Sequence, residues 1–360
     1  MGPSDPPWGG AFRRKMAAMG KVAAARKLAA AAAYGGGGLS VLGASVYGVL
    51  ATEAMLARRV IGGPLDDPVR DATGWYGRHR PGPVIRLAVL GDSSGAGYGV
   101  DTVEDTPGAH LGSGLAEAAD RRVYVRAVCV VGAQTSDLGQ QIDQALGMRP
   151  DVAVVLIGTN DVTHRVRPSE SVRLLELGVR RLRDAGVEVV VGTCPDLGTL
   201  EPVAPPLRQL ARSWSRRLAA AQTIAVVEAG GRTVSLGSIL GPEFAASPKV
   251  LFGPDQFHPS AAGYASLAAV LLPSVLAAVG EVPAGEVELE AIRGESVLPV
   301  SDAAVEATRT PGTEVGGTEV AGSKRGVRGR WVQLRHRRRQ PETDIESPAA
   351  SEETPAASGT

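Results

Sequence analysis

The chain has 360 residues, 44% of them hydrophobic, and its 38 basic residues balance its 38 acidic ones. This balance excludes a general attraction to polyanions, and two cysteines exclude a disulfide framework or a multi-thiolate metal cluster. The 46 glycines and 25 prolines exceed the usual share of a globular domain, which predicts disordered ends around a folded middle.

The N-terminal part of the chain is basic and then apolar. Residues 1–27 form a basic segment with six Lys and Arg side chains and one acid, and residues 28–52 carry no charge. This apolar segment is long enough to cross a ~30 Å hydrocarbon core as a helix, although its most hydrophobic part, residues 39–50, has the length of a signal-peptide core. An uncleaved membrane anchor, a cleaved export signal and a soluble Ala/Gly-rich helix all stay open. Either of the first two places the rest of the protein outside the cytoplasm, anchored or secreted.

The middle of the chain alternates between two kinds of segment. After a predicted linker at residues 53–82, short β-branched runs at 84–90, 123–131, 152–157, 187–192 and 223–227 read as strands. Longer segments at 138–146, 171–185 and 206–221 suit helices. This alternation predicts a single α/β domain over residues 83–280, with a parallel sheet covered on both faces. The uncharged segment 259–280 is predicted to be a buried core helix rather than a second membrane span.

The hydrophobic pattern disappears after residue 280. Residues 281–360 are predicted to be a disordered tail that includes a basic block at 324–339. Trp331 lies within this block, an arrangement that suits contact with anionic lipid or nucleic acid. The plainer interpretation is a solvated linker, and we expect no nucleic-acid partner.

Polar side chains follow the ends of four predicted strands, where an open parallel sheet binds its ligands. The four segments read Gly91-Asp92-Ser93, Gly132-Ala133-Gln134, Gly158-Thr159-Asn160-Asp161 and Thr193-Cys194-Pro195-Asp196. A fifth, Asp255-Gln256-Phe257-His258, stands just before the last predicted helix. We expect these segments to meet at one edge of the sheet.

These residues suit acyl transfer, which needs a hydroxyl nucleophile, an imidazole base, a carboxylate that orients the base, and neutral donors for the oxyanion. Ser93 is the candidate nucleophile, His258 the candidate base and Asp255 the orienting carboxylate. The backbone N–H groups of Ser93 and Gly132 and the Asn160 amide are the candidate oxyanion donors. His164 is a candidate for lining the substrate entrance, with a surface position as the alternative.

The ordered blocks Gly91-Asp92-Ser93, Gly132, Gly158-x-Asn160-Asp161 and Asp255-x-x-His258 resemble the SGNH, or GDSL, hydrolases over roughly residues 86–280. The resemblance implies a flavodoxin-like three-layer α/β/α fold with a five-stranded parallel sheet in the order 2-1-3-4-5. It also implies ester hydrolysis through an acyl-enzyme, the site roles given above, and no metal or other cofactor. The first block reads Gly-Asp-Ser-Ser rather than Gly-Asp-Ser-Leu, so Ser94 has to be excluded as the nucleophile by mutation. The N-terminus looks like that of exported or membrane-anchored actinobacterial members.

The sequence therefore predicts a monomeric serine hydrolase that cleaves carboxylic esters of small molecules or lipids, with thioesters equally compatible. The alternative is a non-catalytic ligand-binding or envelope scaffold protein on the same fold. Nucleotide binding at the glycine-rich residues 95–99 is disfavoured, because the spacing differs from that of a dinucleotide loop and no Lys-Ser/Thr pair follows. Cys129 and Cys194 fall on strands about 14 Å apart in the expected order, which predicts two buried free thiols.

Overall fold

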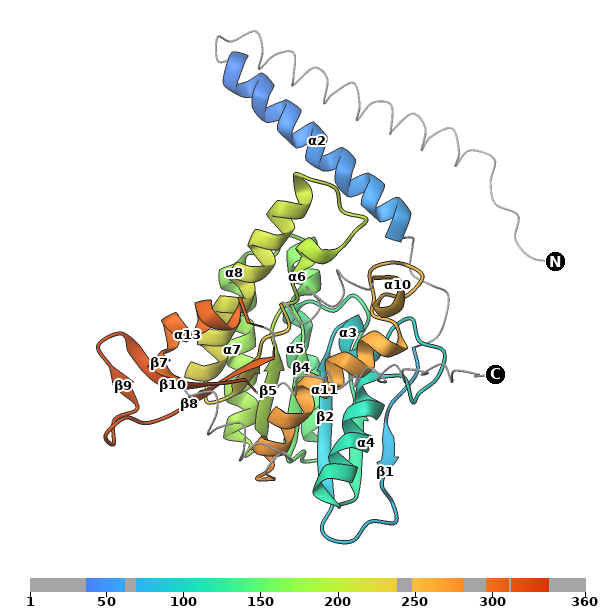
Figure 1. Cartoon of the computed structure of the whole chain (residues 1–360), viewed down its shortest axis with the longest axis vertical. Helices are drawn as coiled ribbons and strands as arrows, with labels where there is room; N and C mark the ends of the chain where they lie inside the picture. Colours follow the sequence, from blue (N-terminus) through green and yellow to red (C-terminus); the bar gives the residue numbers. More distant parts are fainter. Residues whose placement is uncertain (1–36, 62–68, 238–247, 282–295, 311, 337–360) are drawn as a thin grey trace, which may run out of the picture.

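The fold is built on one mixed β-sheet (Figure 1). The computed structural model describes residues 37–61, 69–237, 248–281, 296–310 and 312–336. Within these residues ten strands form the sheet, in the order β1-β3-β2-β4-β5-β6-β8-β10-β7, with β9 paired to β10. The strands are β1 (Gly74–Tyr76), β2 (Ile85–Gly91), β3 (Val123–Ala127), β4 (Val152–Leu156), β5 (Glu188–Gly192), β6 (Arg232–Val234), β7 (Ser296–Pro299), β8 (Thr313–Gly317), β9 (Arg325–Gly326) and β10 (Gly329–His336).

Five neighbouring strands, β3-β2-β4-β5-β6, are parallel, and the strands outside them pair in the antiparallel sense. The predicted α/β architecture is confirmed, but the expectation of a wholly parallel five-stranded sheet is incomplete because antiparallel strands extend both edges. The predicted strand at 223–227 is wrong, since it lies in α8 (Leu207–Glu228). Val226 and Val227 are buried there in two different core clusters. Because α8 is covered on two sides, its sequence contains a run of β-branched residues like that of a buried strand.

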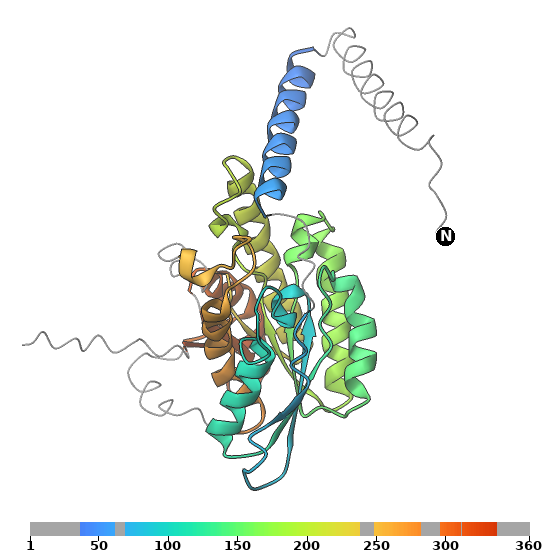
Figure 2. The ribbon, with the colours of Figure 1, turned by 90° about the vertical axis from the view of Figure 1, so that its right-hand side faces the viewer.

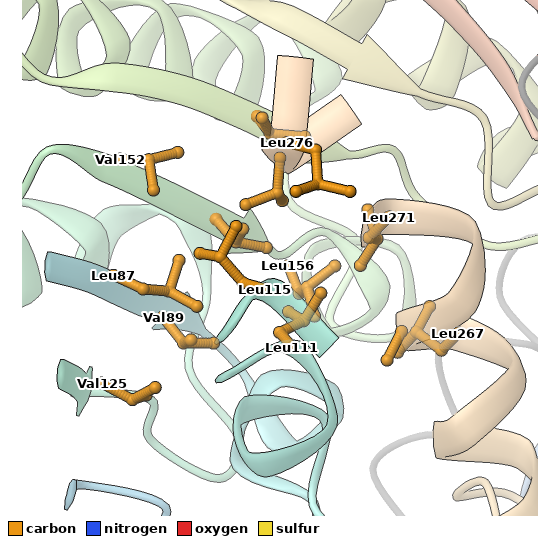
Figure 3. Packing of buried hydrophobic residues seen from close by; sticks show 14 of the residues in the cluster. Leu87, Val89, Leu111, Leu115, Val125, Val152, Leu156, Leu267, Leu271 and Leu276 are labelled. Carbon is orange, nitrogen blue, oxygen red and sulfur yellow. The ribbon is translucent and has the colours of Figure 1, made fainter. Parts of the chain in front are cut away.

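Helices cover both faces of the parallel strands (Figure 2). α4 (Pro107–Ala119) and α11 (Ala261–Ala278) lie on one face, and α5 (Leu138–Leu146) and α7 (Pro168–Asp184) lie on the other. Because successive side chains of a strand point to opposite faces, Leu87 and Ala88 belong to different core clusters. Figure 3 shows the first cluster, in which the labelled side chains of the sheet and the two helices are Leu87, Val89, Val125, Val152, Leu156, Leu111, Leu115, Leu267, Leu271 and Leu276.

The helix α11 is the one described helix that is long and apolar enough to cross a membrane by length and composition. Half of it is buried inside the protein, where it packs on α4 and the sheet. Ser260 begins this helix by accepting a hydrogen bond from the Gly263 N–H through its side-chain oxygen at 3.2 Å. The prediction that residues 259–280 form a core helix is confirmed.

The C-terminal part of the described chain adds a second layer to the sheet edge. α13 (Val300–Ala307) buries Ala303 and Ala307 against Val332 and Leu334 of β10. Strand β8 pairs with β6, which joins this unit to the parallel strands. The prediction of disorder from residue 281 is therefore wrong for residues 296–336, while residues 282–295 and 337–360 lie outside the described residues. Trp331 belongs to β10 rather than to a solvated basic segment.

The N-terminal helix α2 (Gly37–Ile61) projects from the body beside α8 (Figure 1). Its C-terminal end contacts the domain: Glu53 Oε2 accepts the Leu207 N–H at 2.9 Å, and Ala57 is buried with Leu197 and Leu200. The predicted linker at 53–82 is thus wrong where α2 continues to Ile61 and where β1 pairs with β3. Residues 1–36, with the basic segment and the start of the apolar one, lie outside the described residues.

Candidate active site

The turn after β2 presents Ser93 at the carboxyl end of the parallel strands. Asp92 caps the short helix α3 (Ser93–Ala96), and its Oδ1 accepts the Ser94 N–H at 2.9 Å. Gly91 has φ of +138°, and a Cβ there would lie 1.8 Å from the Leu156 carbonyl oxygen. Only glycine allows β2 and β4 to approach this closely at the turn. Ser93 is consequently held in a buried position, with 6% of its surface exposed.

Three side chains form a continuous hydrogen-bonded chain. The Ser93 Oγ lies 3.0 Å from Nε2 of His258, and Nδ1 of His258 lies 2.6 Å from Oδ2 of Asp255. The second Asp255 oxygen accepts the backbone N–H groups of Phe257 and His258, each at 3.0 Å. The carboxylate is thereby fixed within its own turn, as the spacing of three residues predicts.

The expected oxyanion donors follow β3 and β4. Gly132 has φ of +81° and nothing within 4 Å of the position that a Cβ would occupy, so its backbone is open to a ligand. Asn160 lies in the short helix α6 (Thr159–Thr163), and its Nδ2 donates to the Ala133 carbonyl at 3.0 Å. That bond uses one amide hydrogen and joins the loop after β3 to α6, while the second hydrogen is available to a ligand.

Comparison with known proteins identifies the family of the chain. The GDSL-like Lipase/Acylhydrolase family model matches residues 89–266. The GDSL-like esterase Rv1075c of Mycobacterium tuberculosis (strain ATCC 25618 / H37Rv) is 42% identical over 251 residues, which cover 66% of this chain and 79% of the relative. The chain belongs to the GDSL-like lipase/acylhydrolase family. It has the α/β SGNH hydrolase fold and is a GDSL-type serine esterase, a hydrolase of carboxylic esters.

Two solved structures are also similar to this esterase. The crystal structure of TesA has 21% sequence identity and a TM-score of 0.44, and covers 54% of this chain and 99% of its own. Axe2, an acetylxylan esterase from Geobacillus stearothermophilus, has 19% identity and a TM-score of 0.40, and covers 56% of this chain and 97% of its own.

Asp92, beside the hydrogen-bonded chain, and Asp255, within it, have opposite pKa shifts. Burial raises the pKa of Asp92 to about 6, against the hydrogen bonds from Ser94 and the nearby charge of His258. Burial also acts to raise the pKa of Asp255, but the hydrogen bonds from the His258 side chain and the Phe257 N–H outweigh it and lower that pKa. Asp255 therefore stays ionised at neutral pH beside His258.

An apolar cavity of about 50 Å³ lies beside His258 in the esterase. Its lining includes Asp92 and Ser94 of the turn after β2, Thr159 after β4, and the apolar side chains of Leu200, Phe252 and Phe257.

His164 does not line the cavity beside His258. It is exposed, and its Nδ1 lies 2.9 Å from the Asn160 carbonyl oxygen of its own helix. Cys129 and Cys194 are both free, as predicted, but only Cys194 is buried as expected, whereas Cys129 is partly buried. Burial raises both thiol pKa values. Among the described residues, no group of three or more His, Cys, Asp and Glu side chains could hold a metal ion.

Two glutamines that the sequence analysis missed hold the backbone of the site. The Gln141 amide of α5 accepts the Gly91 N–H at 2.7 Å and donates to the Gly91 carbonyl at 2.9 Å. Gln222 of α8 does the same between strands, accepting the Cys194 N–H and donating to the Ile157 carbonyl. Both are fully or almost fully buried, so each one replaces backbone pairing where the strands end.

A buried tyrosine, also missed, supports the same turn from the other side. Tyr264 of α11 donates to the Tyr98 carbonyl at 2.9 Å, and the Tyr98 ring packs edge-on against the His258 ring with centroids 4.8 Å apart. The base is thus positioned by packing as well as by its hydrogen bonds.

Proposed function

We propose that Ser93 is the nucleophile of this esterase, His258 its general base and Asp255 the residue that orients His258. The observation that carries the proposal is the unbroken hydrogen-bonded chain from Asp255 through His258 to Ser93. With Asp255 accepting from Nδ1–H, the neutral imidazole has its lone pair on Nε2, directed at the Ser93 hydroxyl.

The reaction then runs in two steps. Ser93 Oγ attacks the ester carbonyl as its proton passes to His258 Nε2, and the imidazolium returns this proton to the departing alcohol. A water molecule next loses a proton to His258 Nε2 and attacks the acyl-serine carbonyl. The imidazolium then returns this proton to Ser93 Oγ as the bond to the acyl group breaks, which releases the carboxylic acid and restores the hydroxyl. The Asp255 carboxylate stabilises the imidazolium in both steps.

The negative oxygen that forms in each step needs donors already in place. We assign this role to the backbone N–H groups of Ser93 and Gly132 and to the second hydrogen of the Asn160 amide. Removing one such donor typically costs about 10²–10³-fold in turnover. Asn160→Ala is therefore expected to reduce kcat by this amount with little change in KM.

We infer that the substrate is an ester of a short acyl group. The apolar cavity beside His258 has a volume of only about 50 Å³, which favours a short acyl chain over a long one. Activity on p-nitrophenyl esters should accordingly fall from butyrate to palmitate.

We further propose that the uncharged segment 28–52, whose described part lies in α2 before Glu53, anchors the esterase in a membrane, with the hydrolase domain outside the cytoplasm. These 25 residues would extend about 37 Å as a helix. In the described part of this segment the large apolar side chains of Val46, Tyr47 and Val49 are exposed. The six basic residues among the first 27 favour a cytoplasmic N-terminus. A periplasm-type reporter fused after residue 80 should be active, and activity of a cytosolic reporter alone would refute the anchor.

The decisive experiment compares two adjacent serines. Ser93→Ala should lower kcat on p-nitrophenyl acetate by about 10⁴-fold or more. Ser94→Ala is the matched control: Ser94 lines the cavity, so KM can change, but kcat should stay within about tenfold of the wild type because the Ser94 side chain has no part in the hydrogen-bonded chain from Asp255 to Ser93. Loss of activity in Ser94→Ala with retention in Ser93→Ala would overturn the assignment.

A further inference from the structure

A second cavity, of about 360 Å³, lies at the amino-terminal ends of the parallel strands, opposite to the carboxyl ends where Ser93 lies. Glu188 and Arg232 line it, and each is the first residue of its strand, β5 or β6. Ser93 instead follows the last residue of β2. This cavity is therefore separate from the ester-hydrolysing site and plays no part in the function proposed above.

The cavity lies where the parallel strands meet the C-terminal unit through the pairing of β6 with β8. The parallel part contributes Arg183, Glu188 and the segment Gly230-Gly231-Arg232. The C-terminal unit contributes Glu314 and Gly316-Gly317 from β8, and Arg330, Gln333 and Arg335 from β10. The pocket exists only because residues 313–336 join the sheet.

Arginine dominates the charge of this cavity. Four arginines and two glutamates line it, an excess of two positive charges. The glutamates already have partners within the protein: Glu188 pairs with Arg183, and Glu314 lies 3.5 Å from Arg232 and accepts the Ser274 hydroxyl hydrogen at 2.5 Å. The remaining charge has to be balanced by solvent ions or by an anionic ligand.

Arg330 is placed as a ligand-binding arginine would be. Its Nε is buried and has no hydrogen-bond partner among the described residues. The guanidinium lies against the backbone of Gly317, where a Cβ would come within 2.8 Å of Nε. Glycine at this position therefore makes room for the guanidinium, and a buried donor without a partner costs about 1–3 kcal/mol unless a ligand or water satisfies it.

We propose that this cavity binds a phosphate group, with Arg232, Arg330 and Arg335 as its ligands. The planar guanidinium offers paired N–H donors that match the oxygens of a phosphate, and two excess charges match the dianion of a phosphate monoester. Gln333 adds an amide that can donate to a phosphate oxygen or accept from a neighbouring hydroxyl. A volume of about 360 Å³ holds the phosphate ester of a small alcohol.

Bound phosphate would connect β10 to β6 and so hold the C-terminal unit on the parallel strands. Ligand binding to the folded state alone raises the free energy of unfolding. The thermal unfolding temperature should accordingly rise with phosphate concentration and reach saturation.

The test uses the full-length chain in a non-ionic detergent, with chloride keeping the ionic strength constant. Thermal unfolding and calorimetry are followed with inorganic phosphate, with glycerol 3-phosphate, and with phosphatidylglycerol or phosphatidylcholine added to the micelles. Binding of the soluble phosphates identifies a soluble ligand, and binding of phosphatidylglycerol alone identifies a lipid headgroup. Either result supports the proposal, and no saturable response to any of them overturns it.

Variants separate the cavity from general charge effects. Arg330→Gln and Arg335→Gln should each weaken phosphate binding by about tenfold or more, the usual effect of losing a charged hydrogen bond. Arg328→Gln is the matched control, because Arg328 lies in the same hairpin with 77% of its side chain exposed and does not line the cavity. Arg330→Lys keeps the charge but loses the paired donors, and serves if the glutamine variant unfolds. Equal affinity in Arg330→Lys, Arg335→Gln and the wild type would refute the site.

Discussion

The buried carboxyl of Asp92 makes a specific prediction about stability and pH. Its pKa is about 6 in the folded protein, against an ordinary value of 3.8. Between these values the folded protein retains a proton that the unfolded chain has lost, so the folded state is favoured at low pH. The contribution of Asp92 is full below pH 3.8 and is lost as the pH rises through 6, by about 3 kcal/mol in total.

Replacing Asp92 by Asn removes this dependence. The Asn side-chain oxygen can still accept the Ser94 N–H, so the cap of α3 is retained. Linkage gives a loss of about 1.6 kcal/mol by pH 5 and about 3 kcal/mol by pH 8 for the wild type, a difference of about 1.4 kcal/mol that the variant does not show.

Urea unfolding followed by tryptophan fluorescence at both pH values measures this difference for each protein. Other titrating groups are common to both and cancel in the comparison, as does any pH-independent cost of the added amide. If the wild type and Asp92→Asn lose the same free energy of unfolding between pH 5 and pH 8, Asp92 does not have a raised pKa and the reasoning fails.

Three further predictions concern Gln141, the two cysteines and the C-terminal strands. Gln141→Leu removes both hydrogen bonds to Gly91 at similar side-chain volume and should lower the free energy of unfolding by about 2–3 kcal/mol, measured by urea unfolding. A small effect of Gln141→Leu beside a large effect of Gln141→Ala would instead attribute the role of Gln141 to packing. After unfolding in the absence of reductant, both cysteines should react with a thiol reagent, whereas the buried Cys194 should not react in the folded protein; no reactive thiol in the unfolded chain would contradict their free state. Truncation after residue 280 should abolish the cooperative thermal transition because it removes β8 from the edge of β6, whereas truncation after residue 336 should preserve it. A folded, active chain ending at residue 280 would show that the C-terminal strands are dispensable.

Four of the five parallel strands could be predicted from the sequence because a short polar motif follows each of them, and these motifs carry most of the candidate site residues. At these strand ends the pattern changes from apolar to polar within one or two residues, as at Gly91 and Gly158. The topology then brings these ends together without further information.

The C-terminal strands could not be predicted in the same way. In β10 the buried Val332 and Leu334 alternate with partly exposed polar residues, and a cluster of arginines hides this two-residue period. Their core is small and consists largely of alanine and valine, so the segment has the composition of a disordered tail. Gln141 was missed for another reason: a polar residue on an amphipathic helix normally faces water, and only the tertiary structure shows that this one faces Gly91.

The pairing of β6 with β8 has a consequence for the order in which the protein is made. About 80 residues separate the end of β6 from the end of its partner β8. At a synthesis rate of about 5–20 residues per second, the hydrogen-bonding edge of β6 is complete roughly 4–16 s before β8 has emerged. During this interval the nascent chain carries an open strand edge, a template for pairing with other chains. The sheet of the esterase domain is thus completed only after its C-terminal strands have emerged. A chain that ends before β8 keeps the edge of β6 unpaired.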